Sequence, residues 1–468
     1  MNKIIFLLLI LCTQALVAQD SVHTLSARQV MEIVKRYHPV ALQAGILVEQ
    51  AKADLVSARG QFDPVFENEA AQKTFEGTAY YSYNRPEISI PTWFGIEVKA
   101  GLEYLSGNRT DPVDTKGESS YLGISIPLAK NLLMDKRRAA LQSAKIFRQA
   151  SVAERRNMLN QLMLDALKSY WSWVKEYQLY QVMNEAVAIN ESRFRWVRSA
   201  YQLGDRAAID TTEVLAQWQQ FELLRSQAWL NFQNAGLELS VYLWTAGAQP
   251  YELPSNIIPQ EPLREISVMN QPVPVLNELL NAAVSNHPEL RLYQYKLQAL
   301  NIERKLKFQE LLPVVNFRYN QLGRGYDVWK TATSPYFENN YRYGLSIAVP
   351  LRLSQGRGEY KKARLKINYA ELELEQKKRQ VENKVRSYFN ELLALKEQVK
   401  WQEQSWRNYL QLQRAEELRF RSGESSLFLV NARETKALEA LQKLLELKAK
   451  YFVSENTVRW AAGNLVQE

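Results

Sequence analysis

Residues 125–128 read Ser-Ile-Pro-Leu, and residues 348–351 read Ala-Val-Pro-Leu. Each of these junctions ends a run of alternating apolar and polar residues, and a long segment poor in proline and glycine follows it. The order of motifs recurs further along, because Tyr-Gln-Leu-Gly at 201–204 matches Phe-Arg-Ser-Gly at 420–423. Repetition of this kind indicates one structural unit written twice, which we interpret as helix–strand–strand–helix.

The repeat divides the 468 residues into segments. We predict a signal peptide at 1–18, a first repeat at 20–249, a proline-rich connector at 250–274 and a second repeat at 275–468. The offset between the copies is 249 residues at the first helix and 223 residues at the Pro-Leu junctions. We interpret the 26 additional residues of the first copy as longer loops, because loops vary in length more readily than helices or strands.

Strict alternation predicts β-strands within 62–127 and within 313–350. From Phe94 to Tyr104 every second residue is apolar or aromatic, and the same holds from Tyr341 to Val349. Tyr and Trp gather at the strand ends, as they do in the interfacial girdles of membrane barrels. We predict two strands in each unit, with residues 62–74 forming either a separate strand or the start of a longer bent one. A soluble sandwich would show the same alternation.

The helices are unusually long. Neither proline nor glycine occurs from 136 to 203 or from 359 to 422, so each segment predicts a helix of roughly 90–100 Å. A glycine follows each segment as an expected C-cap, and a returning helix completes helical hairpins at 136–246 and 359–461. Apolar residues from Val381 to Val399 follow a near-heptad spacing, so these hairpins need neighbouring helices to cover their stripes.

The N-terminus has the features of a secretory signal peptide. Lys3 precedes an apolar run from Ile4 to Leu11, and polarity resumes after Ala18, so we expect cleavage after Ala18 or after Gln19. Cys12 is the only cysteine, and because Leu11 before it is not small we do not expect lipidation. No other segment has the about 18 consecutive apolar residues of a transmembrane helix. The net charge is +9, but Lys and Arg are interspersed with Glu along the helices. We therefore do not expect nucleic-acid binding.

Two units of two strands give four strands per chain, which cannot close a barrel because the smallest natural barrels have about eight. Open sheet edges do not persist in lipid. The sequence therefore predicts that several chains pool their strands. The alternative is a soluble periplasmic coiled-coil adaptor or scaffold protein, which would be extracted without detergent.

The sequence resembles the TolC family of outer-membrane efflux proteins along essentially the whole mature chain. The duplicated layout, the two Pro-Leu junctions and the tip turns at 201–210 and 420–430 carry the resemblance. It implies an α+β membrane protein: a homotrimer with a 12-stranded β-barrel continued by a long α-helical periplasmic tunnel. It also implies that the chain lies in the outer membrane of a Gram-negative cell. Its partners would be a periplasmic adaptor (membrane fusion) protein, an inner-membrane pump and outer-membrane lipid, without a cofactor.

The resemblance assigns roles to residues at the tips. The expected adaptor-contacting residues are Leu203, Gly204, Asp205, Ser422, Gly423 and Glu424. The expected periplasmic gate consists of Asp210, Glu213, Tyr201 and Phe420. The second tip has Leu429 and Ala432 where some members carry an acidic ring, so we expect Asp210 and Glu213 to supply the negative charge. Ordinary helix capping remains the alternative role for these positions.

Other charged and polar motifs carry less. Lys136-Arg137-Arg138 and Lys361-Lys362 follow the junctions, either facing lipid phosphates or forming solvated helix starts. His38 and His287 precede prolines at equivalent positions, which indicates a turn rather than a metal site. The glycines at 355–358 lack the Lys-Ser/Thr of a phosphate loop. We find no catalytic constellation and predict that the protein is not an enzyme.

Overall fold

The computed structural model describes residues 23–111 and 113–465. The predicted signal peptide, with Cys12 and the cleavage site, lies outside the described residues. The chain forms two compact units, and each takes segments from both sequence repeats. Among the described residues, the helical unit contains 23–42, 159–279 and 384–465, and the sheet unit contains 43–111, 113–158 and 280–383. The repeats are therefore units of sequence rather than of packing.

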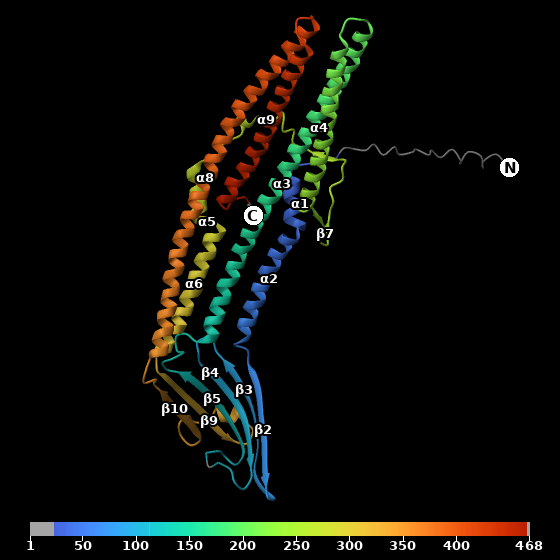
Figure 1. The fold of residues 1–468 in the computed structure, drawn as a ribbon. Coiled ribbons are helices and arrows are strands. Elements are labelled where there is room, and N and C mark those ends of the chain that lie inside the picture. Colours follow the sequence, from blue (N-terminus) through green and yellow to red (C-terminus); the bar gives the residue numbers. More distant parts are fainter. Residues whose placement is uncertain (1–22, 112, 466–468) are drawn as a thin grey trace, which may run out of the picture. The chain divides into compact units, whose positions relative to one another are not determined.

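The sheet unit contains one six-stranded antiparallel sheet of order β10-β9-β5-β4-β3-β2 (Figure 1). Its strands are β2 (Val65–Phe75), β3 (Thr78–Pro91), β4 (Glu97–Ser106), β5 (Gly117–Pro127), β9 (Val314–Arg324) and β10 (Tyr341–Ala348). The first repeat thus supplies four strands and the second repeat two.

The prediction of two strands in each unit is therefore wrong for the first repeat. The additional residues of that copy form strands rather than loops, because β2 and β3 make a tight hairpin. Its turn residues Glu76 and Gly77 have φ of 49° and 75°, which suits a two-residue hairpin turn. The strand predicted from Phe94 begins instead at Glu97, since residues 92–95 form a turn. The prediction of a 12-stranded barrel was based on four strands per chain, whereas this sheet has six strands.

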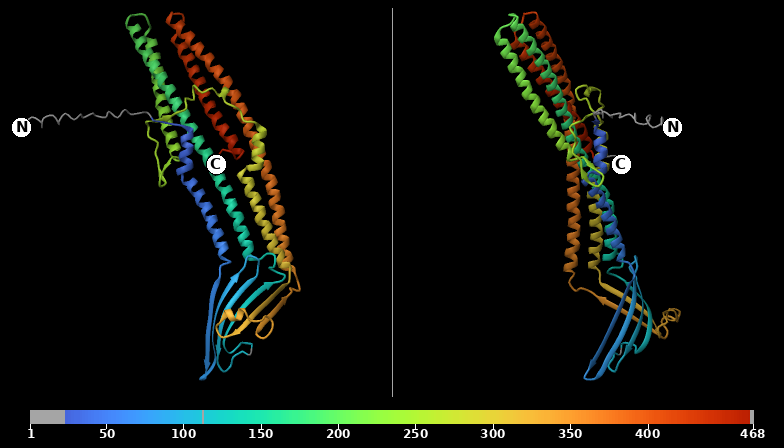
Figure 2. Two further views of the ribbon diagram at one scale, coloured as in Figure 1. Left: turned by 180° about the vertical axis from the view of Figure 1, so that it is seen from behind. Right: turned by 90° about the vertical axis from the view of Figure 1, so that its right-hand side faces the viewer.

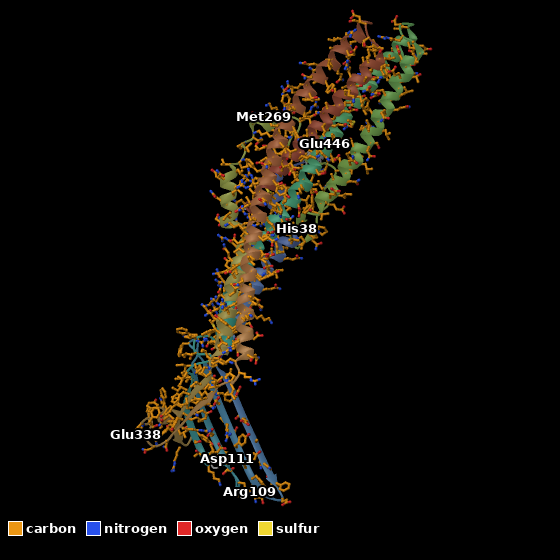
Figure 3. The ribbon with its side chains drawn as sticks, turned by 60° about the vertical axis from the view of Figure 1, so that its left-hand side comes forward. His38, Arg109, Asp111, Met269, Glu338 and Glu446 are labelled. Carbon is orange, nitrogen blue, oxygen red and sulfur yellow. The ribbon has the colours of Figure 1, made fainter. Side chains whose placement is uncertain are left out.

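The two faces of the sheet differ in polarity. Residues opposite each other in the register share a face, and one row across five strands reads Ile90, Val98, Ile124, Tyr319, Tyr343. The alternate residues form the opposite face, and one of its rows reads Ser89, Lys99, Gly123, Asn320, Arg342. We call these the apolar face and the polar face. Figure 3 places the labelled loop residues Arg109, Asp111 and Glu338 at the end of the sheet remote from the helices.

Four helical segments adjoin the sheet within the sheet unit. They are most of α2 (Pro39–Gly60), α6 (Pro288–Phe308) and the first parts of α3 (Lys136–Gln202) and α8 (Ser354–Arg421). Ion pairs tie α6 to α8, for example Lys296–Glu373 at 2.6 Å. A Cβ on Gly356 would lie 2.6 Å from the Glu310 carbonyl oxygen. The glycine there permits close helix packing, which explains the glycine-rich run at the start of α8 without a phosphate.

The helical unit contains two long hairpins. One joins α3 to α4 (Ala208–Ser240), and the other joins α8 to α9 (Leu427–Ala461). Both views of Figure 2 show these hairpins side by side, with their turns at the same end. The Trp171 ring stacks on Phe452 at 4.4 Å between centroids, which packs α3 against α9. None of the helices in the described part of the chain has both the length and the apolar character needed to cross a bilayer.

Shorter elements complete the chain. They are α1 (Ala27–Tyr37), α5 (Leu276–Asn286), α7 (Val328–Ala332), the 3₁₀ turns Val268–Asn270 and Gln309–Leu311, and the short pairs β1 (His23–Leu25) with β8 (Ile257–Pro259) and β6 (Trp244–Thr245) with β7 (Gln249–Pro250). The connector is anchored by Lys448, whose buried Nζ donates to the carbonyls of Arg264 at 3.0 Å and Ile266 at 2.8 Å.

The two histidines before prolines both cap helices. The Nδ1 atom of His38 accepts a hydrogen bond from the Val40 amide at 3.1 Å, at the start of α2. His287 Nδ1 accepts from the Glu289 amide at 3.3 Å, at the start of α6. Each imidazole therefore satisfies an amide that the first helical turn leaves without an intrahelical partner.

Candidate functional site

The two hairpin turns of the helical unit have the same backbone geometry. In the first turn the Asp205 amide donates to the Ala200 carbonyl at 2.9 Å, and the Gly204 amide donates to Tyr201 at 3.0 Å. The second turn repeats both bonds from Glu424 and Gly423 at 2.9 and 3.1 Å. This pair of bonds is the Schellman motif, which requires a left-handed residue after the helix. The glycines supply it, with φ of 84° and 78°.

The turn residues are exposed. Leu203 is 79% exposed, and in the second hairpin Phe428 is 68% exposed. Asp205 and Glu424 are exposed beside them and place a carboxylate at each turn. A solvated capping turn does not require large apolar side chains at its surface, so these two turns have the composition of contact surfaces.

An apolar cluster behind the turns joins both hairpins. It consists of Val197, Val214, Phe420, Leu427 and Val430, with Phe194 packed against it. Phe420 is 3% exposed, whereas Tyr201 at the matching position of the first repeat is 46% exposed. The sequence grouped these two aromatics together, and the structure places one in the core and the other at the surface.

Arg206 connects the first turn to the second hairpin. Its guanidinium lies 4.2 Å from the centroid of the Phe420 ring and donates to the Phe420 carbonyl oxygen at 3.2 Å. Its other nitrogen is 4.0 Å from the Asp210 carboxylate, and Trp196 lies 5.7 Å from its central carbon. Asp210 is thus partly neutralised by a cation of its own helix start. The corresponding position of the second repeat is Ser425, so this cation is specific to the first copy.

Glu213 also faces the second hairpin. Its carboxylate accepts a hydrogen bond from the Asn431 amide nitrogen at 3.2 Å, so α4 is tied to α9 one turn beyond the tip. Of the four expected gate residues, Asp210, Glu213 and Phe420 therefore belong to contacts around Arg206 and Asn431, and Tyr201 lies outside them.

A buried ion pair that was not predicted from the sequence lies next to these residues. Arg193 of α3 is 9% exposed and Glu434 of α9 is 2% exposed, and their nearest atoms are 2.7 Å apart. Asn190 donates to the same carboxylate at 3.2 Å, and Asn431 lies 3.4 Å from the guanidinium. A signal was present, because Asn190 and Arg193 continue the spacing of the buried Val187 and Val197 on α3. Polar residues within an apolar stripe indicate buried partners.

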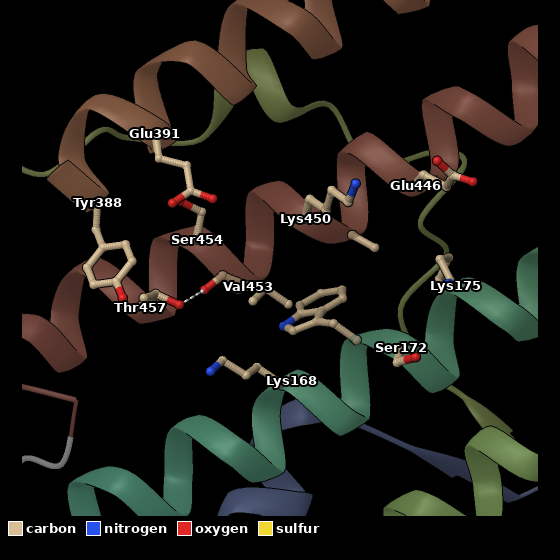
Figure 4. Close-up of a pocket in the computed structure, with 12 residues that line it drawn as sticks. Lys168, Ser172, Lys175, Tyr388, Glu391, Glu446, Lys450, Val453, Ser454 and Thr457 are labelled. Carbon is tan, nitrogen blue, oxygen red and sulfur yellow. Dashed lines mark hydrogen bonds between the residues drawn. The ribbon is translucent and has the colours of Figure 1, made fainter.

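The helical unit also contains an open pocket between α3, α8 and α9 (Figure 4). Three lysines line it, Lys168, Lys175 and Lys450, together with the carboxylates of Glu391 and Glu446. The dashed hydrogen bond in Figure 4 joins the Thr457 hydroxyl to the Val453 carbonyl within α9, so it is internal to one helix. In the described part of the chain, His, Cys, Asp and Glu form no group that could hold a metal ion.

A comparison with known protein families matches part of the chain. Residues 279–464 match the family described as outer membrane efflux protein. This match agrees with the efflux family predicted from the tip turns and the Pro-Leu junctions. The match covers most of the second repeat. A comparison with curated proteins gives no match.

Solved structures of outer-membrane channels share the fold. The Campylobacter jejuni CmeC channel is 15% identical with a TM-score of 0.65, covering 94% of this chain and 86% of CmeC. The Vibrio cholerae outer membrane protein VceC is 13% identical with a TM-score of 0.63, covering 94% and 96%. The open-state Neisseria gonorrhoeae MtrE channel is 14% identical with a TM-score of 0.65, covering 94% and 89%. The predicted α+β fold of strands continued by long helices is confirmed.

Proposed function

We propose that this protein is the outer-membrane channel subunit of a tripartite efflux system, and that three copies form the conduit. The observation that carries the proposal is the amphipathic six-stranded sheet, followed in both repeats by a long helical hairpin. An exposed apolar face suits lipid, and the polar face suits an aqueous lumen. A soluble periplasmic adaptor would have no use for such a sheet, so the family and the sheet both disfavour that alternative.

Fractionation and conductance test the proposal. We expect the protein in the outer-membrane fraction, released only by detergent, with the mass of a trimer in light scattering. Insertion into a planar bilayer should then produce discrete conductance steps. A soluble monomer without conductance would refute the channel assignment.

We propose that both turns contact the periplasmic adaptor, through Leu203, Gly204 and Asp205 in the first hairpin and Ser422, Gly423 and Glu424 in the second. Their exposure and matched backbone geometry support this role. Asp205→Lys combined with Glu424→Lys should abolish adaptor-dependent efflux while leaving the purified channel intact. The matched control is Glu338→Lys, an exposed acid in the β9–β10 loop, which should leave efflux unchanged.

We propose that Asp210, Glu213 and Phe420 form a periplasmic gate together with Arg206, and that Tyr201 lines its exposed side. Asp210 and Glu213 would give the constriction a negative collar. Asp210→Asn with Glu213→Gln should reduce cation selectivity in single-channel recordings. Unchanged ion selectivity would exclude the collar while leaving the channel function itself standing.

We propose that lipid contacts the junction between strands and helices. Trp93, Phe94, Leu133 and Leu351 are exposed there, at 74, 47, 73 and 100%. The exposed Lys136 follows Leu133 within one helical turn, and the exposed Lys361 and Lys362 follow Leu351 in the first turns of α8. Apolar groups first and cations next is the order expected at the inner leaflet. Arg138 has a different role, because it hydrogen-bonds Asp135 and the Leu132 carbonyl oxygen. Lys361→Glu/Lys362→Glu should weaken binding to vesicles containing anionic lipid.

A further inference from the structure

The six-stranded sheet ends in two strands, β2 on one side and β10 on the other. Each end strand presents a row of main-chain amides and carbonyls on its outer edge. In hydrocarbon such an edge must be paired, because each unsatisfied group costs several kcal/mol. What pairs with these two edges therefore decides how the channel closes.

The directions of the two edges are compatible. β2 begins at Val65, just after α2 ends at Gly60, and so it runs away from the helices. β10 ends at Ala348, just before α8 begins at Ser354, and so it runs towards them. An edge β10 placed beside the β2 of a second copy is consequently antiparallel, like every other pair in this sheet.

The faces of the two edges are compatible as well. On β10 the apolar face carries Leu345 and Ile347, which are 55% and 63% exposed. On β2 the same face carries Phe66, which pairs with Ile88 and is 67% exposed. Keeping both faces continuous requires even-numbered residues of β10 on the polar face to meet odd-numbered residues of β2, since a one-residue slip would reverse the faces.

The polar face carries opposite charges at its two edges. On β9 and β10 it bears the arginines Arg318, Arg324 and Arg342 and no acidic residue. On β2 it bears Glu67 and Glu69 near the helix-side end and Lys73 near the hairpin turn. The edges of two copies are therefore complementary in charge around Glu67 and Glu69.

Matching the helix-side ends of the strands sets a register. With Ala348 opposite Val65 of the next copy, Ser346 lies opposite Glu67 and Gly344 opposite Glu69. Gly344 also pairs with Arg318 inside the sheet, and a Cβ on it would meet nothing within 4 Å. The missing side chain leaves Arg318 room to reach Glu69 across the strand, while Arg342 reaches it diagonally.

The helices that adjoin the two edge strands in sequence also expose stripes of apolar residues. α2 leads into β2 and exposes Ile46 and Val56 at 56% and 65%. α8 follows β10 and exposes Leu365, Tyr369 and Leu372 at 56, 65 and 72%, with heptad spacing. A second copy placed at the strand edges would cover these stripes too.

We infer that β10 of one copy pairs with β2 of the next through Arg318 and Arg342 on Glu69, so that three copies close an eighteen-stranded barrel. This inference rests on the proposed trimeric channel and deepens it. An eighteen-stranded barrel encloses an aqueous lumen by itself, as porins of 16–18 strands do, whereas twelve strands enclose a narrower one. The first repeat's additional hairpin thus widens the outer pore without changing the helical wall.

Cysteine pairs test the seam, and the described part of the chain contains no cysteine to interfere. Glu67→Cys combined with Ser346→Cys should cross-link on mild oxidation into covalent dimers and closed trimers. The control is Glu67→Cys with Leu345→Cys, which places the second thiol on the opposite face and should not cross-link. Glu69→Arg should lower the yield of assembled channel severalfold, and Arg342→Glu in the same chain should restore part of it.

A strand count by electron microscopy of the purified channel completes the test. Eighteen strands with β2 next to the β10 of a neighbour would support the inference. Twelve strands, with the β2–β3 hairpin outside the wall and no cross-link at the seam, would overturn it while leaving a conducting trimer. A monomer without conductance would instead refute the proposed function, so the two failures are distinguishable.

Discussion

Arg193→Met should loosen the helix ends behind both turns, because it leaves the Glu434 carboxylate buried without its cation. Arg193 supplies two of the three hydrogen bonds to that carboxylate, at 2.7 and 3.3 Å, and Asn190 supplies the third at 3.2 Å. Glu434 is only 2% exposed, so water does not replace the lost donors. Removal of one partner from a buried ion pair destabilises by about 3–5 kcal/mol. The lower value corresponds to a roughly 150-fold larger population of opened helix ends.

Hydrogen–deuterium exchange by mass spectrometry measures that population in the purified protein. We expect amides of α9 around 430–437 and of α3 around 190–197 to exchange about two orders of magnitude faster in Arg193→Met. The double variant Arg193→Met/Glu434→Leu should recover most of the protection, since an apolar pair of similar volume fills the same space. A matched control is Lys436→Met, which removes an exposed ion pair to Glu439 and should change exchange little. Equal exchange in the single and double variants would refute the reasoning.

Three further predictions follow from the helical unit and the start of α8. Gly423→Ala should destabilise the protein by about 1 kcal/mol, because the φ of Gly423 is 78°. Gly358→Ala inside α8 should stabilise it by about 1 kcal/mol, so the two variants should shift the melting temperature in opposite directions. Burial lowers the pKa of Lys448 in the folded protein, so the unfolded chain binds this proton more readily. The free energy of unfolding should therefore rise as pH increases towards 10.5, and Lys448→Met should flatten that rise when stability is measured by chemical denaturation. Burial also lowers the pKa of His38, so the melting temperature should fall as pH decreases through and below 6.5. His38→Asn keeps an acceptor at the helix cap and should remove this fall between pH 5 and 7.5.

The elements that sequence reasoning found are those with a local cause. The stripe from Val381 to Val399 is visible in spacing alone, and Val381, Val385, Leu392 and Val399 are indeed buried. Gly204 and Gly423 mark helix ends because only a residue tolerant of positive φ completes the turn. Each of these features is set by residues within a few positions of one another.

The features that were not predicted depend on contacts between residues that are distant in sequence. The 26-residue difference between the copies was read as loop length, although Glu76-Gly77 is a turn signal between two alternating runs. Strands of mixed composition such as β2 show weak alternation, since an edge strand with Glu67 and Glu69 on one face and Asn68 on the other is polar on both sides. Arg193 and Glu434 are 241 positions apart, so no local pattern pairs them.

Three contacts behind the turns cross from one hairpin to the other, and they constrain how a gate there could open. Arg206 donates to the Phe420 carbonyl oxygen and lies over the Phe420 ring. Glu213 accepts a hydrogen bond from Asn431, and Arg193 forms an ion pair with Glu434. Separating the two hairpins of one chain would break all three ties, including the buried ion pair between Arg193 and Glu434. Movement of one chain against its neighbours breaks none of them. Within the proposed trimer, opening is therefore favoured between copies, with both hairpins of a chain moving as one body. The Arg193→Met variant removes the strongest of these ties, so its single-channel recordings should show additional substates that the double variant lacks.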